Sequence, residues 1–275
     1  MTTERTAVAI TIAASDSGGG AGIQADLKAF ARAGVHGTSA IVALTAQNTR
    51  EVNSVQTLPR EFILDQIRTI AADVGVDAVK IGMLFDEPTI AAVAEGLDEL
   101  EGAPVVVDPV MVAESGAALL QPNAKRALVD RILPRAAVVT PNLPEARELS
   151  GLGIDAGPAE LARGVHELGA GAVVVTGGHS ESGVDLFFDG VALEALDGPR
   201  HPDGASHGSG CTHSSALAAH LALGWTPLEA ARKARLIAAE AVRDGLRDVG
   251  EGSGPVDALG IAARASRPGQ TARRQ

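Results

Sequence analysis

The sequence contains no tyrosine and a single cysteine, and aromatic residues make up only 2 % of its 275 positions. One cysteine cannot form an internal disulfide, so we expect a reducing compartment, the cytoplasm, and a free thiol at Cys211. With so few aromatics, the core must be built from Ala, Val, Leu and Ile, and hydrophobic residues account for 45 % of the chain. That composition is typical of sheets enclosed between helices.

Long apolar runs and clusters of positive charge are also absent. No stretch approaches the roughly 18 apolar residues that a membrane helix needs. The first apolar run has only eight residues, from Ala7, and lacks a convincing cleavage pattern, so we expect neither a signal peptide nor membrane binding. The formal net charge of −11 argues against nucleic acid as a partner, because binding to phosphate backbones draws on clustered Lys and Arg.

Short continuous apolar runs alternate with helical patterns along the chain. Such runs predict strands buried on both faces, and helices between them imply right-handed parallel crossovers. The predicted strands are Ala7–Ala14, Ala40–Leu44, Ala78–Ile81, Val105–Val107, Ala136–Val139 and Ala172–Val175, with Val184–Gly190 as a later strand of an antiparallel edge. The predicted helices are Ile23–Ala33, Arg60–Val74, Pro88–Leu100, Asn123–Leu133, Ala159–Leu168, Cys211–Leu223 and Pro227–Leu246. Together they predict an α/β fold, a three-layer α/β/α sandwich with a mostly parallel central sheet.

No repeat or linker divides the chain, so we predict a single domain over residues 1–264. Beyond Gly250 the sequence loses its periodicity, and its end is basic. Residues 265–275 are therefore predicted to form a mobile C-terminal tail.

Polar and glycine-rich stretches follow the predicted strands. The first six strands are followed, in order, by SDSGGGAGIQAD, AQN, KIGM, DPVM, TPNLPE and TGGH. In open α/β sheets, ligands bind beyond the carboxyl ends of the strands. This shared placement predicts an enzyme or a small-molecule binder.

The first of these stretches contains a weak dinucleotide motif. Gly20–Ala25 fits G-x-G-x-x-A, but no acidic residue stands about 20 residues further on, where the chain is apolar. A flexible turn, or a loop that admits a ligand close to the backbone, is the better interpretation. A Walker-type phosphate loop is missing too, because none of the four lysines follows a glycine.

The stretch Gly208–Cys211 directly precedes a predicted helix. Consecutive amides at a helix start, together with the helix dipole, form an anion site that needs no basic side chain. The same position lowers the pKa of a thiol, which would favour a reactive Cys211. The alternative is a glycine-rich N-cap with a small buried cysteine. Two histidines of this region, His207 and His213, and a third, His179, are expected to line the site only.

Two acidic residues stand in strand-end loops. Asp108 ends VVVD, and Glu145 lies in PNLPE. Together they could hold Mg²⁺ through water, because magnesium keeps much of its hydration and takes few protein carboxylates. Alternatively, Asp108 fixes its turn and Glu145 stabilises a helix N-terminus.

Taken together, SDSGGGAGIQADLKAF, ALTAQNTR, VDAVKIGML, VVVDPVMVAESG, VTPNLPEARELSG, TGGH and HGSGCTHSSALAAHLALG resemble the hydroxymethylpyrimidine/phosphomethylpyrimidine kinases of thiamin biosynthesis, a family of the ribokinase-like superfamily. The resemblance runs in order from about Ala7 to Val256. It implies transfer of the γ-phosphoryl group of ATP, with Mg²⁺, to 4-amino-5-hydroxymethyl-2-methylpyrimidine, and a second transfer onto the monophosphate. Because relatives are commonly dimeric, it also implies a homodimer.

The resemblance also implies roles for residues that match the family by position. Catalytic roles at the phosphate fall to Gly208, Ser209, Gly210 and Cys211, with Cys211 beside the accepting hydroxyl. The pyrimidine would be bound by Asp26 and Gln47, in a pocket lined by Ala21, Met83 and Val110. The nucleotide would be bound by Asn142, Thr176 and Gly178, and the metal would be held by Asp108 and Glu145. The polar, glycine-rich segment 201–210 is a candidate lid.

Two positions depart from the family pattern. Ala14 stands where glycine is frequent, which tightens the space over the substrate ring. Thr176 stands where many relatives carry lysine, so we expect weaker ATP binding. Two other functions stay open: a pyridoxal or pyridoxine kinase of the same superfamily, and a non-catalytic pyrimidine-binding sensor.

Overall fold

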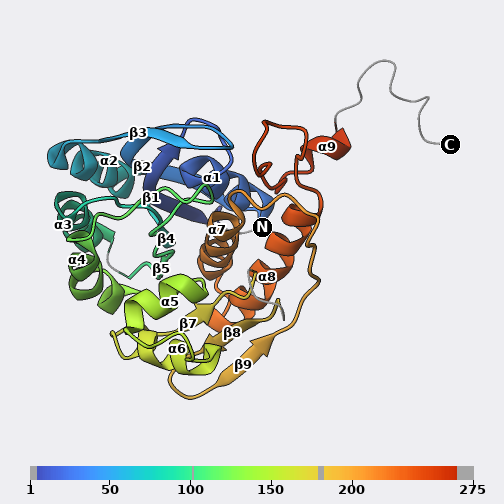
Figure 1. The fold of residues 1–275 in the computed structure, drawn as a ribbon. Coiled ribbons are helices and arrows are strands. Elements are labelled where there is room, and N and C mark those ends of the chain that lie inside the picture. Colours follow the sequence, from blue (N-terminus) through green and yellow to red (C-terminus); the bar gives the residue numbers. More distant parts are fainter. Residues whose placement is uncertain (1–4, 101, 179–182, 265–275) are drawn as a thin grey trace.

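The computed structural model describes residues 5–100, 102–178 and 183–264, and in them nine strands form one sheet in the order β3-β2-β1-β4-β5-β6-β7-β8-β9 (Figure 1). The strands are β1 Val8–Asp16, β2 His36–Gln47, β3 Val52–Thr57, β4 Ala78–Ile81, β5 Val105–Val107, β6 Val138–Val139, β7 Val173–Val175, β8 Asp185–Phe188 and β9 Leu193–Leu196. Pairing is parallel from β2 through β7, whereas β3, β8 and β9 pair antiparallel with their neighbours. The predicted mostly parallel sheet with an antiparallel edge is confirmed.

Helices cover both faces of the sheet, which confirms the predicted three layers (Figure 1). One face is covered by α2 Arg60–Asp73, α3 Glu87–Gly96, α4 Ala124–Arg131, α5 Leu143–Ser150 and α6 Pro158–His166. The other is covered by α1 Gly22–Arg32, α7 Ser209–Ala222 and α8 Pro227–Arg243. A short helix, α9 Ile261–Arg264, follows near the end of the described chain. None of the helices in these described ranges is long and apolar enough to cross a membrane.

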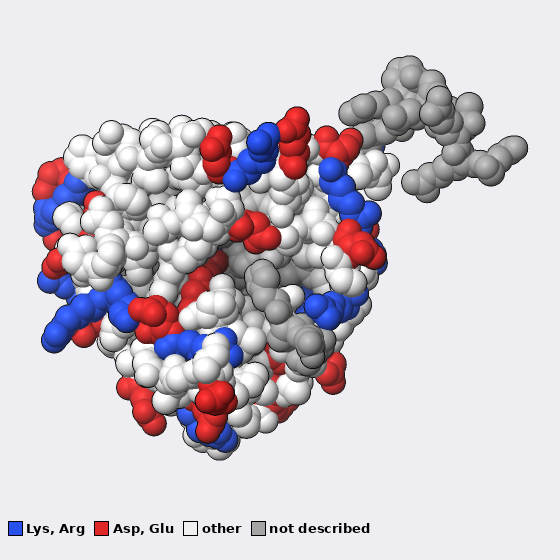
Figure 2. Space-filling view, viewed as in Figure 1, with Lys and Arg blue, Asp and Glu red and all other residues white. Residues whose placement is uncertain are grey.

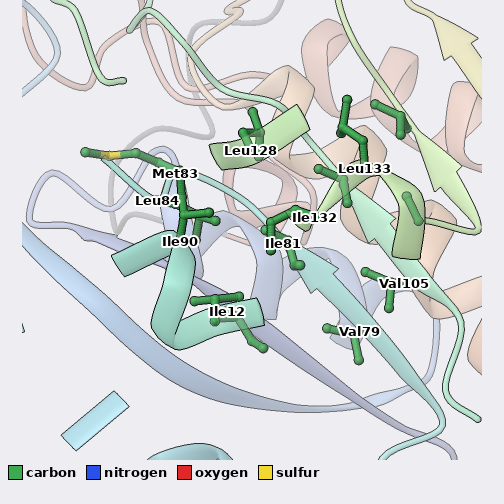
Figure 3. Close-up of a cluster of buried hydrophobic side chains, with 14 of the residues drawn as sticks. Ile12, Val79, Ile81, Met83, Leu84, Ile90, Val105, Leu128, Ile132 and Leu133 are labelled. Carbon is green, nitrogen blue, oxygen red and sulfur yellow. The ribbon is translucent and has the colours of Figure 1, made fainter. Parts of the chain in front are cut away.

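The strands separate two apolar clusters because successive side chains point to opposite faces. In β4, Val79 and Ile81 join the cluster under α2–α6, part of which Figure 3 shows with Ile12 and Val105 beside them. Ala78 belongs to the cluster under α1, α7 and α8. Complete burial of an Ile or Val side chain stabilises the fold by about 1.5–3 kcal/mol, so these runs dictate the central layer.

The observed elements differ from the predicted ones mainly at the edges. Helix α7 begins at Ser209 rather than Cys211, and α5, β3 and β9 were not predicted. Glu145 was predicted to stand in a strand-end loop, with a role at a helix N-terminus as the alternative, and it lies in the first turn of α5, where Pro144 is well tolerated. Strand β3 is half-exposed and polar, so it carries no buried apolar run. The predicted mobile tail 265–275 lies outside the described residues.

Candidate active site

A cavity of about 490 Å³ opens beyond the carboxyl ends of the parallel strands. It brings together all but one of the predicted site residues: Ala21, Gln47, Met83, Asp108, Val110, Asn142, Glu145, Thr176, Gly178, Gly208, Ser209, Gly210 and Cys211. The face shown in Figure 2 is hollowed near its centre, and acidic side chains lie inside the hollow. Asp26 does not line the cavity.

The first turn of α7 provides free backbone amides. Gly208 is the N-cap residue with φ +84°, and a Cβ there would collide with the carbonyl oxygen of Gly20. The Ser209 N–H donates to the Ser206 carbonyl at 2.9 Å, so it is not available to a ligand. The amides of Gly210 and Cys211 have no acceptor among the described residues. The anion site therefore rests on two amides at the positive end of the helix dipole.

The Cys211 thiol does not behave as its helix position predicts. Burial raises its pKa to about 12, with Asp108 and Asp26 adding to the rise and Lys80 opposing it. The expectation of a lowered thiol pKa is therefore wrong for the ligand-free protein, because loss of solvent outweighs the helix dipole. At neutral pH the side chain is a thiol.

Asp108 and Glu145 approach each other at the acidic side of the cavity. Burial raises the pKa of Asp108, and burial together with the charge of Asp108 raises that of Glu145 to about 8. Asp108 Oδ2 accepts a hydrogen bond from Ser214 Oγ at 3.0 Å. Glu145 forms a capping box with Asn142, through two bonds of 2.9 Å, so it also stabilises the start of α5.

This pair fits a hydrated magnesium ion. A divalent cation would stabilise the charged form of these two neighbouring buried carboxylates, whose pKa values are raised. Mg²⁺ needs few protein ligands. Among the residues that the structure describes, no group of three or more His, Cys, Asp or Glu is placed to hold a metal. The donor set therefore suits an ion that keeps most of its water rather than one enclosed by protein.

One wall of the cavity combines an amide with apolar side chains. Gln47 Oε1 accepts a hydrogen bond from Thr45 Oγ1 at 3.1 Å, and the main-chain N–H of Gln47 donates to Ser17 Oγ at 2.8 Å. Met83 and Val110 line the same cavity. The Gln47 amide is therefore held by its neighbours on a wall suited to a flat heteroaromatic ring.

Asp26 is placed below this wall rather than in it. Its carboxylate is fully buried and accepts bonds from Thr11 Oγ1 at 2.6 Å, Lys80 Nζ at 2.8 Å and Ser215 Oγ at 2.7 Å. Lys80 itself lines the cavity. Asp26 was predicted to contact the pyrimidine directly, but its carboxylate does not line the cavity. It bonds instead to Lys80, which does.

Asp16 and His207 join the glycine-rich turn after β1 to the start of α7. Asp16 accepts bonds from the Gly18, Gly20 and Ala21 amides, and His207 Nε2 lies 3.0 Å from Asp16 Oδ2. Burial raises the pKa of Asp16, but the hydrogen bonds of His207 and these amides outweigh it and hold that pKa below its usual value. Sequence reasoning gave neither residue this role.

The opposite side of the cavity surrounds Asp185, at the start of β8. Asp185 Oδ1 accepts the Gly177 N–H at 2.8 Å, which ties it to the turn that holds Thr176. His213 Nε2 and Arg235 Nε stand 3.5 and 3.6 Å from Asp185 Oδ2, and among the described residues these two buried atoms have no hydrogen-bond partner, although Arg235 Nη2 donates to the Gly183 carbonyl. Burial lowers the pKa of His213, so its ring is neutral. His179 lies outside the described residues.

Several of these cavity residues left a signal in the sequence. Lys80 interrupts a run predicted to be buried on both faces, and Arg235 interrupts the alanine-rich face of α8. A charge inside an apolar pattern indicates either a paired ion or a ligand contact. Asp185 and Thr45 carried no such signal, because Asp185 begins β8 and Thr45 lies near the end of β2, where polar residues are common.

Comparisons with known proteins show which family this chain is similar to. A family model described as phosphomethylpyrimidine kinase matches residues 16–257. A hydroxymethylpyrimidine/phosphomethylpyrimidine kinase of Rhizobium meliloti (strain 1021) is 50 % identical over 258 residues, which cover 91 % of this chain and 96 % of that protein. A thiamine biosynthesis bifunctional protein of Geobacter sulfurreducens is 46 % identical over 252 residues, 90 % of this chain and 51 % of that protein.

A solved structure similar to this chain is the ADP complex of Bacillus subtilis pyridoxal kinase. It has a TM-score of 0.85 and 36 % sequence identity, and the match covers 94 % of this chain and 99 % of the other. The overlap of nearly complete chains agrees with the layers and topology described above.

Proposed function

The chain belongs to the phosphomethylpyrimidine kinase family, and from this membership we propose that it phosphorylates 4-amino-5-hydroxymethyl-2-methylpyrimidine with ATP and then phosphorylates the monophosphate, in thiamine biosynthesis. The observation that carries the proposal is the pairing of the free Gly210 and Cys211 amides with the Asp108 and Glu145 carboxylates across one cavity. Amides favour a phosphoryl group, and the carboxylates favour its metal.

In the proposed reaction, the γ-phosphoryl group lies against the Gly210 and Cys211 amides. The bond from γ-phosphorus to the hydroxymethyl oxygen forms, the bond to the bridging oxygen of ADP breaks, and the hydroxyl proton is released. Phosphoryl transfer passes through a loose transition state, so positioning and charge stabilisation supply most of the catalysis. The two amides are fixed by the helix before substrate arrives, so they need no reorganisation.

Asp108 and Glu145 would hold Mg²⁺, which when bound neutralises charge on the phosphate oxygens. Cys211 is proposed to stand beside the accepting oxygen as a thiol, because its raised pKa leaves little thiolate near neutral pH. Gln47 is proposed to bind the aminopyrimidine edge, with Ala21, Met83 and Val110 around the ring. Asn142, Thr176 and Gly178 would contact the nucleotide on the side of Asp185.

The experiment that tests this function follows both transfers with purified protein, ATP and Mg²⁺. Formation of the monophosphate followed by the diphosphate is expected. Absence of ATP consumption with the pyrimidine present would instead support a ligand sensor and contradict the proposal.

A pyridoxal kinase activity is the second candidate, favoured by the similarity to the Bacillus subtilis pyridoxal kinase structure. Pyridoxal also offers a heteroaromatic ring with a CH₂OH acceptor. The kcat/KM values for the two acceptors are to be compared under one set of conditions. A larger value for the pyrimidine is expected, and a larger value for pyridoxal would reverse the assignment.

We also propose that the enzyme acts in the cytoplasm as a homodimer, with residues 1–264 as one domain. The single free cysteine supports the compartment, the continuous sheet supports the single domain, and the dimer is proposed from the family resemblance alone. Light scattering coupled to gel filtration tests the dimer: a mass of twice 27.8 kDa is expected, and a mass of one chain would contradict it.

A further inference from the structure

Lys80 is a buried cation that lines the cavity and has no role in the reaction described so far. It lies in β4, between Val79 and Ile81, whose side chains belong to the cluster under α2–α6. Since alternate residues point to opposite faces, Lys80 extends toward α1 and α7. Its position is therefore beneath the helix start that carries Gly210 and Cys211.

Asp26 holds the Lys80 ammonium in place. Its carboxylate accepts from three buried donors, Lys80 Nζ, Thr11 Oγ1 and Ser215 Oγ, at 2.6 to 2.8 Å. Asp26 is turned entirely toward protein groups and does not line the cavity. A buried ion pair is weak evidence for a purely stabilising role, because removing both charges from water costs about as much as their attraction returns.

The ammonium keeps hydrogen-bonding capacity for a ligand. Lys has three N–H donors, and among the described residues the Lys80 ammonium has one acceptor, Asp26. A Cβ at Gly82 would stand 2.8 Å from Nζ and 2.9 Å from the Ala13 Cβ, so a side chain at that position would crowd the ammonium. An acceptor in the cavity would complete the coordination of this cation.

The ammonium lies on the acceptor side of the cavity. The Asp108 N–H donates to the Ile81 carbonyl at 2.9 Å, so Asp108 stands beside the end of the strand that carries Lys80, and the Lys80 charge counteracts the burial that raises the pKa of Asp108 and of Cys211. The other Lys and Arg side chains of the described cavity wall belong to the nucleotide side: Arg235 is near Asp185, and Arg200 packs near Gly183. Lys80 is thus the cation placed to meet the phosphorylated end of the acceptor.

We propose that Lys80 binds the phosphate of the pyrimidine monophosphate during the second transfer, and that Asp26 acts as the positioning residue for its ammonium. The inference rests on the proposed two-step function. In the first step the acceptor is a neutral hydroxymethyl group, whereas in the second a phosphate monoester enters a cavity that already holds Asp108 and Glu145. A monoester oxygen bonds to γ-phosphorus while the bond to ADP breaks, so no hydroxyl proton has to leave.

The test compares the two transfers in variants of the complete chain. Lys80→Met alone leaves the Asp26 charge buried and unpaired, which threatens folding, so the Asp26→Asn/Lys80→Met double variant removes both charges. We expect its KM for the monophosphate to rise about 10- to 100-fold, the size of one charge-assisted hydrogen bond, and its KM for the hydroxymethylpyrimidine to rise less than about threefold. Thr11→Val is the matched control, because it perturbs the same cluster and keeps the ammonium.

A folded double variant with equal losses for both acceptors would overturn the proposal and make Lys80 structural. A crystal of the wild-type protein with the pyrimidine monophosphate provides a readout that does not depend on variants. Lys80 Nζ is expected within about 3.2 Å of a phosphate oxygen, and a phosphate well beyond that reach would also overturn the proposal. If the wild-type protein does not phosphorylate the monophosphate at all, the proposed two-step function is wrong. That result differs from the ones above, which would contradict only the role of Lys80.

Discussion

At the scale of single residues, glycine stands at positions 208 and 210, at the start of α7, for two different physical reasons. Gly208 has φ +84° and no space for a Cβ, so the backbone itself requires glycine there. A Cβ at Gly210 would stand 3.9 Å from Asp108 Oδ2, with no clash in the ligand-free protein. Gly210 therefore keeps open the space between amides and carboxylate that a phosphoryl group would use.

Gly210→Val is expected to keep the fold and lose turnover. The added methyl groups occupy the phosphate space, and loss of one transition-state donor typically lowers kcat by about 10²- to 10³-fold. Steady-state kinetics and a thermal melt measure the two effects. Gly153→Val is the control, since that glycine has open space around it and no positive φ; a Gly210→Val enzyme with normal kcat would contradict the anion site.

Gln47→Ala is expected to raise the KM for the pyrimidine by about 2- to 12-fold and to leave the KM for ATP unchanged, because a neutral hydrogen bond to the ring is lost on one side of the cavity. Steady-state kinetics with each substrate varied in turn provide the measurement. An unchanged pyrimidine KM would remove Gln47 from the substrate wall.

Cys211→Ser is expected to slow both transfers to a similar and modest extent, within about tenfold, because a thiol whose pKa is raised to about 12 is not the base at neutral pH. The measurement is the kcat of each transfer from pH 6 to 9. Selective loss of the first transfer by several orders of magnitude would show that a thiolate removes the hydroxyl proton.

Most of the site could be predicted at this scale, and the exceptions share one cause. Gln47 ends β2 and Asp108 directly follows β5, whereas Glu145 and Gly210 lie in the first turns of α5 and α7, and the fold brings these positions together at one edge of the sheet. Asp26 and Cys211 differ because their behaviour depends on burial and on a partner from a distant strand, Lys80. A sequence shows which residue follows a strand, but not whether its side chain faces solvent or a buried cation.

At the scale of elements, the end of β1 and the start of α7 are joined by the Asp16–His207 pair. His207 is also bonded through its backbone to Gly254 and Val256, so the C-terminal segment supports the same turn. Gly20 packs against the His207 ring so closely that a Cβ there would collide with it. The glycine-rich turn after β1 and the start of α7 therefore hold each other in place beside the cavity.

Asp16→Asn is expected to destabilise the protein by about 1.5–3 kcal/mol at neutral pH, because an amide NH₂ would face the Gly20 and Ala21 donors. The folded-state pKa of Asp16 is below its usual 3.8, so its contribution is present above that value and is lost as pH falls through the lower, folded pKa. Denaturant titrations from pH 7 down to pH 3 are the measurement. A difference between wild type and variant that stays constant below pH 3.8 would contradict this assignment.

The sequence predicted central elements better than edge elements. β4 and β5 match their predicted bounds because strands buried on both faces are built mainly of apolar residues, and in β4 only Lys80 departs from this. β3 and β9 lie at the two edges, where one face is solvated and the apolar signal is weak. Edge strands depend on pairing with a neighbour, which a local pattern does not contain.

At the scale of the whole molecule, charged groups gather on two sides of the cavity. Asp16, Asp108 and Glu145 lie with Lys80 on the side proposed for the acceptor and the metal, and Arg235 lies with Asp185 on the side proposed for the nucleotide. The acidic side chains in the hollow of Figure 2 agree with an entrance that favours a metal-bound nucleotide over a free polyanion. The two amides of α7 lie between the two sides.

The central claim is that the Gly210 and Cys211 amides hold the phosphoryl group during transfer. A crystal of the protein with the pyrimidine, Mg²⁺ and a non-hydrolysable ATP analogue tests it most directly. The account predicts a terminal phosphate oxygen within about 3.2 Å of both amide nitrogens, with the metal between that phosphate and Asp108 or Glu145. A terminal phosphate bound elsewhere in the cavity, with both amides facing only water, would contradict it.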